Sequence, residues 1–277
     1  MTLRGPQQTT VLLGTLTGAV WLLGCGNMGG AMLRRWLAAG LRPDQVTVIT
    51  RTERALPDGV RWSPELPRDA APDVLLLAVK PQQLDAVTPA VQAVRPKLLL
   101  SILAGVEEAA LRRRFHADAI IRAMPNLPVA IGKGVTALFG SDVDGEARRT
   151  AEALCAPLGH HEWIADEALF DAVTALAGSG PGFLFRFIDA LGAAGAALGL
   201  PEDQARRLAL ATVEGSAIMA ASSDDSPAAL ADKVASPGGS TREGLNVLDR
   251  DGVLVRLLTE TLRASERRNR EMAAAAR

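Results

Sequence analysis

A glycine-rich segment, Gly24-Cys-Gly-Asn-Met-Gly29, has the spacing of a phosphate-binding turn. It follows an apolar run typical of a buried strand and precedes a stretch with helical periodicity. In that setting Gly24 permits a tight turn, Gly26 lets the backbone approach a pyrophosphate, and Gly29 lets the helix pack closely on the strand. Backbone N–H groups at the start of the helix attract phosphate charge. The segment therefore predicts a dinucleotide-binding site.

The segment after the second predicted strand indicates which dinucleotide is bound. Sites for NAD usually place Asp or Glu there, about 20 residues past the glycines, to bind the ribose 2′-hydroxyl. Here Thr50 stands at that position, and Arg51 and Arg54 follow it. Guanidinium groups bind a phosphate through charge-assisted hydrogen bonds, which favours NADPH, with NADH as a weaker alternative. Glu53 keeps the second choice open, because its carboxylate could face the ribose.

Two further motifs follow predicted strands, at the edge where open α/β sheets bind ligands. Lys80, in Ala78-Val-Lys-Pro-Gln82, is expected either to meet the cofactor or to be an ordinary surface lysine. Asn126, in Arg122-Ala-Met-Pro-Asn126, offers a donor and an acceptor that suit a carboxamide, or stabilises a turn beside proline. The predicted cofactor-binding residues are Gly24, Gly26, Asn27, Met28, Gly29, Arg51, Arg54, Lys80 and Asn126.

Two Gly-rich loops in the second half, Gly178-Ser-Gly-Pro181 and Ser236-Pro-Gly-Gly-Ser-Thr241, precede predicted helices. Both place backbone N–H groups and hydroxyls at helix starts, an arrangement that binds carboxylates. No nucleophile–base pair accompanies them in the sequence. Hydride transfer needs none, because the cofactor carries the chemistry and the protein supplies position and electrostatics.

The composition excludes several other classes of protein. Basic and acidic residues number 30 and 31, for a net charge of -1, which gives no general reason to bind nucleic acid or an anionic membrane. Cys25 and Cys155 have neither disulfide-framework nor metal spacing, which suits a reducing compartment. His160 and His161 would point to opposite faces of a strand, so no metal site is expected. The apolar run at 11–24 is too short to span a bilayer; a cytoplasmic protein is predicted.

The first half alternates short apolar runs with helical patterns, which predicts a doubly wound parallel sheet. The continuous apolar runs are typical of strands that are buried on both faces. Helices are expected near residues 28–39, 82–94 and 106–115. The predicted strands are Ala19–Leu23, Val46–Thr50, Val74–Val79, Lys97–Leu103, Ala119–Ala123 and Gly134–Phe139.

Strand signals stop near residue 165, and helical segments punctuated by Gly and Pro follow. The predicted organisation is a loosely ordered extension (1–18), an NADP-binding Rossmann-type domain (19–165) and an all-helical substrate-binding and dimerisation domain (166–277). Small residues dominate Leu191-Gly-Ala-Ala-Gly-Ala-Ala197. Because such residues bury little area each, the helices are expected to gain burial from a partner subunit.

The motifs together resemble, in type and order, those of the pyrroline-5-carboxylate reductase family. The resemblance extends from about residue 19 to 272, and its most diagnostic part is the last motif followed by Gly244-Leu245 and Leu248-Asp249. The matching motifs are Gly24-Cys-Gly-Asn-Met-Gly29, Ala78-Val-Lys-Pro-Gln82, Met124-Pro-Asn126, Ala175-Leu-Ala-Gly-Ser-Gly-Pro181 and Val234-Ala-Ser-Pro-Gly-Gly-Ser-Thr241.

The resemblance implies NADPH-dependent reduction of L-1-pyrroline-5-carboxylate to L-proline by a homodimer built by the helical domain, often assembled into a decamer. Thr241 would stand beside the imine as the catalytic hydroxyl. The chain departs from the family pattern in three places: Ala235 and Ser240 in the second loop, Gly182-Phe183 where the family often has Ala-Tyr, and residues 1–18, which have no family counterpart. The substrate-binding residues implied are Ser236, Gly238, Gly239, Thr241 and Ser179.

Two other functions compete with this interpretation. A dehydrogenase of the β-hydroxyacid type needs a lysine on the helix after a Gly-rich loop, but here that helix carries Arg186 and the next lysine is Lys233. A non-catalytic NADP-binding regulator would have no reason to keep the Ser236–Thr241 loop. Both features favour the reductase.

Overall fold

The computed structural model describes residues 13–67 and 70–275, which form two compact units. An α/β unit comprises the described residues up to Ser179 and those from Ala264 onward, and a helical unit comprises Gly180–Arg263. The sequence places the boundary near residue 165. Residues 166–179 belong with the α/β unit because Phe170 is buried there against Met124 and Ala137.

Within the described residues, eight strands form one sheet in the order β3-β2-β1-β4-β5-β6-β7-β8. Every adjacent pair is parallel except β6 and β7. The strands are β1 (Val20–Leu23), β2 (Val46–Ile49), β3 (Arg61–Ser63), β4 (Val74–Leu77), β5 (Leu98–Ser101), β6 (Ala119–Pro125), β7 (Gly134–Phe139) and β8 (Gly159–Trp163).

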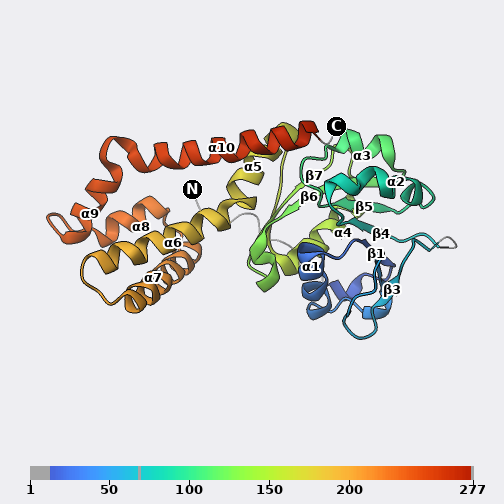
Figure 1. Ribbon diagram of the computed structural model, residues 1–277, viewed down its shortest axis with the longest axis horizontal. Helices are drawn as coiled ribbons and strands as arrows, with labels where there is room; N and C mark the ends of the chain where they lie inside the picture. The colour runs from blue at the N-terminus through green and yellow to red at the C-terminus, as the bar shows by residue number, and fades with distance from the viewer. Residues whose placement is uncertain (1–12, 68–69, 276–277) are drawn as a thin grey trace. The chain divides into compact units, whose positions relative to one another are not determined.

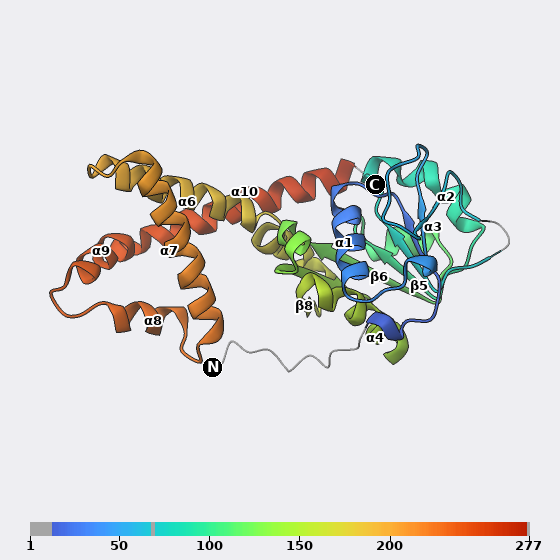
Figure 2. The ribbon, with the colours of Figure 1, turned by 90° about the horizontal axis from the view of Figure 1, so that it is seen from below.

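Helices cover both faces of the sheet, which explains why β1, β2 and β4 are buried at every position and apolar at nearly every one (Figures 1 and 2). Alternate residues of these strands belong to two separate buried clusters. One cluster includes α1 (Asn27–Ala38) and α4 (Gly145–Cys155), and the other includes α2 (Leu84–Gln92) and α3 (Glu108–Arg114). The predicted doubly wound architecture is confirmed.

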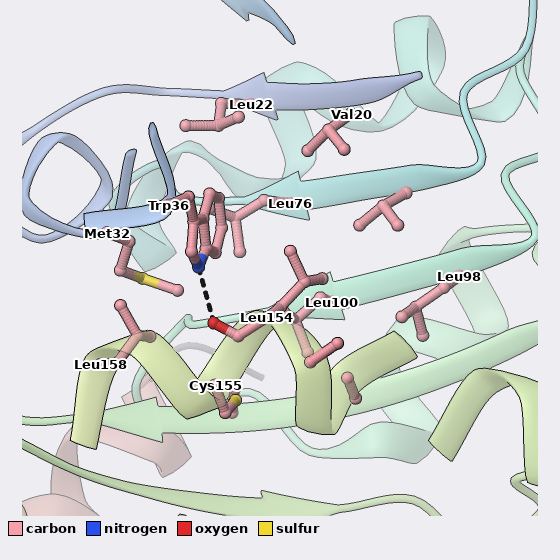
Figure 3. Close-up of a cluster of buried hydrophobic side chains, with 14 of the residues drawn as sticks. Val20, Leu22, Met32, Trp36, Leu76, Leu98, Leu100, Leu154, Cys155 and Leu158 are labelled. Carbon is pink, nitrogen blue, oxygen red and sulfur yellow. Dashed lines mark hydrogen bonds between the residues drawn. The ribbon is translucent and has the colours of Figure 1, made fainter. Parts of the chain in front are cut away.

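Trp36 on α1 shows how the first of these clusters is fixed (Figure 3). Its indole packs among Leu22, Leu76 and Met32, and its Nε1 donates a 2.6 Å hydrogen bond to the Leu154 carbonyl on α4. A buried indole N–H needs such a partner. The bond therefore ties together the two helices on this face of the sheet.

Three features of the sheet differ from the sequence prediction. The β6–β7 pair is antiparallel, because residues 126–133 form a short link with a 3-10 turn, and a parallel return needs a crossover of about a dozen residues or more. Strand β3 is short and partly exposed, and β8 has the sequence Gly-His-His-Glu-Trp. Neither has the apolar run that marks the other strands.

Residues 13–18 are ordered, which corrects the prediction of a loose extension for that part of the chain. Leu13 is buried in the core, and Gln45 Nε2 donates to the carbonyls of Leu16 and Gly18. The carboxylate of Asp73 accepts the Ala19 N–H. These contacts hold the segment and the residue before β1 against the residues that precede β2 and β4. Residues 1–12 of the predicted extension lie outside the described residues.

The helical unit has a small-residue interior and an apolar exterior. Helices α6 and α7 cross where Gly192 and Gly195 face Arg206 and Ala205, with space for little more than a Cβ between the backbones. Large side chains point outward instead, among them Phe185, Phe187, Leu208, Ile218 and Val255. The unit's helices are α6 (Gly180–Ala197), α7 (Glu202–Ser222), α8 (Pro227–Val234), α9 (Ser240–Asp249) and the first part of α10 (Val253–Ala275).

One stretch of the described chain, Glu167–Ala197, is long and apolar enough to cross a membrane by length and composition. Its 18-residue apolar window has a mean hydropathy of 1.3, and 11% of that window is buried. The stretch is not one regular helix: α5 (Phe170–Val173) passes through a π-helical turn at Thr174–Gly178 before α6 begins. A surface of this kind needs a cover, either lipid or protein.

Candidate cofactor pocket and substrate loop

A pocket of about 900 Å³ opens at the carboxyl ends of β1, β2 and β4. Strand β1 lies between β2 and β4, so the strand order reverses direction at β1: β2 and β3 follow on one side of it, and β4 and β5 on the other. Open α/β sheets bind ligands at such a switch point. Five of the predicted cofactor residues line the pocket: Gly24, Gly26, Arg51, Arg54 and Lys80.

The glycine-rich turn has the geometry that the sequence predicts. Gly24 has φ +91°, and a Cβ there would lie 2.6 Å from the Ala78 carbonyl oxygen. Gly29 is buried in the first turn of α1, and a Cβ there would lie 3.2 Å from the Ala78 Cβ. A Cβ on Gly26 would meet nothing within 4 Å. The turn thus needs Gly24 for its backbone and leaves open space above Gly26.

Asn27 and Met28 begin α1 and do not line the pocket among the described residues. The Asn27 side chain is exposed, and Met28 packs partly against the core. Their contribution to an anion is therefore that of the helix start, where unpaired backbone N–H groups carry partial positive charge.

Two arginines follow β2 and border the same pocket. Arg54 Nη1 donates a 3.0 Å hydrogen bond to the Cys25 carbonyl, so its guanidinium is held over the glycine-rich turn. Arg51 and Thr52 also line the pocket, whereas Glu53 is absent from its wall in the part of the chain that the structure describes. The geometry therefore favours the phosphate alternative over a carboxylate facing the ribose.

Thr50 ends the strand with its hydroxyl already engaged. Its Oγ1 donates to the Thr52 carbonyl at 2.9 Å and accepts from Trp62 Nε1 at 3.1 Å. Trp62 lies on β3, the strand that sequence patterning missed. This indole therefore braces the loop that presents Arg51 and Arg54.

Cys25 lies inside the turn and lines the pocket. Burial raises the pKa of its thiol above the usual value, and nearby Arg54 and Arg34 only partly oppose that shift. The thiol therefore stays protonated at neutral pH and adds no negative charge to a pocket suited to phosphates.

The far wall of the pocket comes from residues that the motif analysis did not name. Leu66 follows β3, and Val87, Ala90 and Val94 face the pocket from α2 and the residue stretch after it. The helical periodicity of residues 82–94 predicts a helix there, but it does not predict that residues of this helix line a pocket. Lys80 is exposed at the rim, and its N–H bonds to Gln83 Oε1.

Asn126 does not line this pocket, and its side-chain amide has partners within the protein. Its Oδ1 accepts the Val135 N–H at 2.8 Å, and its Nδ2 donates to the Ala177 carbonyl at 2.9 Å. The side chain is buried. The structure thus supports the turn-stabilising alternative, extended to a segment that is distant in sequence.

The predicted substrate residues fall in both compact units. Ser179 belongs to the α/β unit, directly after the π-helical turn, and its Oγ lies 3.0 Å from Ser265 Oγ on α10. Ser236, Gly238, Gly239 and Thr241 belong to the helical unit.

The Ser236–Thr241 segment forms a tight turn into α9. Gly238 has φ +70°, and the Gly239 N–H bonds to the Ser236 carbonyl. A Cβ on Gly239 would lie 2.5 Å from Ser236 Oγ and 3.1 Å from the Ser236 carbonyl oxygen, so a larger residue would displace the Ser236 hydroxyl. Thr241 is exposed in the first turn of α9, whose N-terminus carries the partial positive charge that suits a carboxylate.

Among the described residues, no group of three or more His, Cys, Asp or Glu side chains is placed to hold a metal ion. The pocket fits a dinucleotide: the space above Gly26 would hold the diphosphate, and the two guanidiniums would meet a further phosphate.

Comparisons with known proteins identify the same two halves. Residues 167–272 match the family model for pyrroline-5-carboxylate reductase dimerisation. Residues 19–105 match the family model for NADP oxidoreductase, coenzyme F420-dependent. The second match contains the glycine-rich turn, both arginines and Lys80, and the first contains the Ser236–Thr241 loop.

Relatives that match nearly the whole chain include several pyrroline-5-carboxylate reductases. The chain is 38% identical to the pyrroline-5-carboxylate reductase of Synechocystis sp., over 91% of this chain and 97% of the relative. It is 34% identical to that of Pseudomonas aeruginosa, over 93% and 97%. Among solved structures, a pyrroline-5-carboxylate reductase from Coxiella burnetii superimposes with a TM-score of 0.82 at 30% identity, covering 92% of this chain and 98% of that one.

Gly24 and Gly26 offer a matched pair of substitutions. Gly26→Ala should fold normally, because its Cβ meets no protein atom within 4 Å, yet weaken dinucleotide binding about tenfold or more by filling the phosphate space. Gly24→Ala should lower the free energy of unfolding by about 1–3 kcal/mol, because φ is positive and the Cβ meets a carbonyl. Cofactor titration and urea unfolding measure both. Equal stability loss in the two variants would contradict this description of the turn.

Proposed function

The chain belongs to the pyrroline-5-carboxylate reductase family, and from this premise we propose that it reduces L-1-pyrroline-5-carboxylate to L-proline with NADPH. It is an NAD(P)H-dependent oxidoreductase of proline biosynthesis, and the preference for NADPH is part of the proposal. The observation that carries the proposal is that a phosphate-suited pocket and a glycine-rich carboxylate loop occur in one chain, each within its matching family segment.

In the pocket, Arg51 and Arg54 bind the 2′-phosphate and the Gly24–Gly29 turn binds the diphosphate. NADPH, when bound, supplies the hydride for the C=N carbon. The hydrogen bond from Arg54 to the Cys25 carbonyl holds that guanidinium in place before any phosphate arrives, which lowers the entropy lost on binding. Lys80 at the rim adds a third positive charge.

In the helical unit, the Ser236–Thr241 turn binds the substrate. Backbone N–H groups at the start of α9 and the Ser236 hydroxyl bind the carboxylate, and Gly238 and Gly239 let the backbone come close. The Thr241 hydroxyl donates a hydrogen bond to the ring nitrogen or passes it a proton, since reduction of an imine consumes one proton as well as the hydride. Ser179, in the α/β unit, is proposed as a further substrate-binding residue.

The family match of residues 167–272 shows that the chain forms an oligomer and acts on a small molecule. We propose a homodimer covered along the apolar outer faces of α6, α7 and α10, with a decamer as a further assembly. Covered in this way, the Glu167–Ala197 stretch meets protein and not lipid. The proposed location is the cytoplasm, with neither membrane nor nucleic acid as a partner, in keeping with the net charge of -1.

Turnover tests the activity directly. Purified protein should oxidise NADPH only when pyrroline-5-carboxylate is present, and Thr241→Ala should lower kcat/KM about 10- to 100-fold, the size of one lost hydrogen bond to a charged group. NADPH affinity should not change. Ser240→Ala, which removes the neighbouring hydroxyl, is the control and should stay near wild type. A folded wild-type protein without turnover would refute the assignment.

The two arginines should separate by effect. Arg51→Ala should reduce the preference for NADPH over NADH about tenfold or more, because only NADPH carries the 2′-phosphate. Arg54→Ala should weaken both cofactors, since it also removes the anchor of the Cys25 carbonyl. Kd values for the two cofactors measure this, with the exposed Arg42→Ala as the control. If replacing Arg51 and Arg54 together left the ratio of the Kd values for NADPH and NADH unchanged, the 2′-phosphate would lie elsewhere.

A further inference from the structure

The segment from Glu167 to Gly178 leads into Ser179, and a single strand holds it at both ends. Arg122 on β6 contacts the beginning of the segment, and Asn126, directly after β6, contacts its end. Between these points Phe170 is buried against Met124, which lies on the same strand. The motif Arg122-Ala-Met-Pro-Asn126 thus carries both anchors.

The first anchor is an ion pair between a buried Arg122 and a partly buried Glu167. The Arg122 side chain is 7% exposed, and its Nη1 lies 2.6 Å from Glu167 Oε1. Its guanidinium also lies 4.3 Å from the centre of the Phe170 ring. The same carboxylate oxygen accepts the Glu108 N–H at the start of α3. Because these bonds are partly buried and charge-assisted, they hold the beginning of the segment against the sheet.

The second anchor repairs a defect that Pro181 creates. In a regular helix the Ala177 carbonyl would accept the N–H of residue 181, but proline has none. The chain here passes through a π-helical turn, and Asn126 Nδ2 supplies the donor from outside the helix, at 2.9 Å. The amide oxygen of Asn126 is meanwhile fixed by the Val135 N–H on β7. The side chain is therefore oriented at both of its polar atoms.

We propose that Asn126 is a positioning residue: it substitutes for the helix N–H that Pro181 lacks and so fixes the turn that presents Ser179. In its catalytic consequence, the inference rests on the proposed function, since Ser179 is a proposed substrate residue. The structural part, that Asn126 fixes the turn, is independent of the proposed function. Ser179 lies two residues beyond the bonded carbonyl, its N–H bonds to the Thr174 carbonyl, and its hydroxyl contacts Ser265. A shift of the turn would move that hydroxyl.

A positioning role and a cofactor-binding role for Asn126 predict different effects on NADPH affinity. A cofactor-binding residue would lower NADPH affinity when it is replaced, and a change at Pro181 would not restore it. A positioning residue that donates to Ala177 would leave NADPH affinity intact. Its loss would be compensated by any other donor at the same carbonyl, and the substitution Pro181→Ala provides one.

The experiment compares Asn126→Ala, Pro181→Ala and the double variant in the full-length protein. Asn126→Ala should speed hydrogen exchange in peptides covering residues 174–184 about tenfold and raise KM for pyrroline-5-carboxylate by a similar factor, with the Kd for NADPH unchanged. The double variant should recover most of both losses, because replacing the proline restores a backbone N–H that can donate to the Ala177 carbonyl. Pro181→Ala alone should leave hydrogen exchange in residues 174–184 at the wild-type rate.

Two results would overturn the proposal: no recovery in the double variant, or a loss of NADPH affinity in Asn126→Ala equal to the loss for the substrate. Asn126→Asp is the second variant if alanine prevents folding. It keeps an acceptor for the Val135 N–H but places a second acceptor against Ala177, so exchange in 174–184 should again rise. Exchange is measured without turnover, so a failure of the proposed function in the wild type remains distinguishable from a failure of this inference.

Discussion

The turn between β1 and α1 passes so close to the end of β4 that a side chain at Gly24 would collide with the Ala78 carbonyl. Much of the cofactor site follows from this approach. It brings the start of α1 to the carboxyl edge of the sheet, directs the Cys25 carbonyl toward Arg54, and leaves the space above Gly26 unfilled. Because Gly24 has a positive φ and Gly29 packs against Ala78, two glycines are needed for shape and one for the ligand.

Patterning predicted the central strands well because both faces of the sheet are covered, which leaves these strands buried throughout and apolar at nearly every position. It missed β3 and β8 for the corresponding reason: edge strands that are exposed on one side keep polar residues such as Arg61 and His160. Direction is a different matter. Periodicity is the same for parallel and antiparallel strands, so only the short link at 126–133 could have indicated that β7 reverses.

The candidate site divides in the same way. Gly24 and Gly239 stand where a positive φ or a close approach restricts the residue type, and a requirement of this kind is local. Residues chosen for side-chain chemistry depend on what lies opposite in the fold. Asn126 has the groups to bind a carboxamide, but its partner is a carbonyl 51 residues away in the chain. Which of two neighbouring arginines reaches the Cys25 carbonyl was equally undetermined by local sequence.

The two units solve the problem of burial differently. The α/β unit encloses large side chains on both faces of its sheet, whereas the residues buried in α6 and α7 are Gly192, Ala205 and Ala209. Close helix packing through small residues leaves large apolar groups outside, so the helical unit gains its missing burial by association. Helix α10 has residues in both units. Its first turns belong to the helical unit, and its last turns belong to the α/β unit, where Ala273 packs against Gly105.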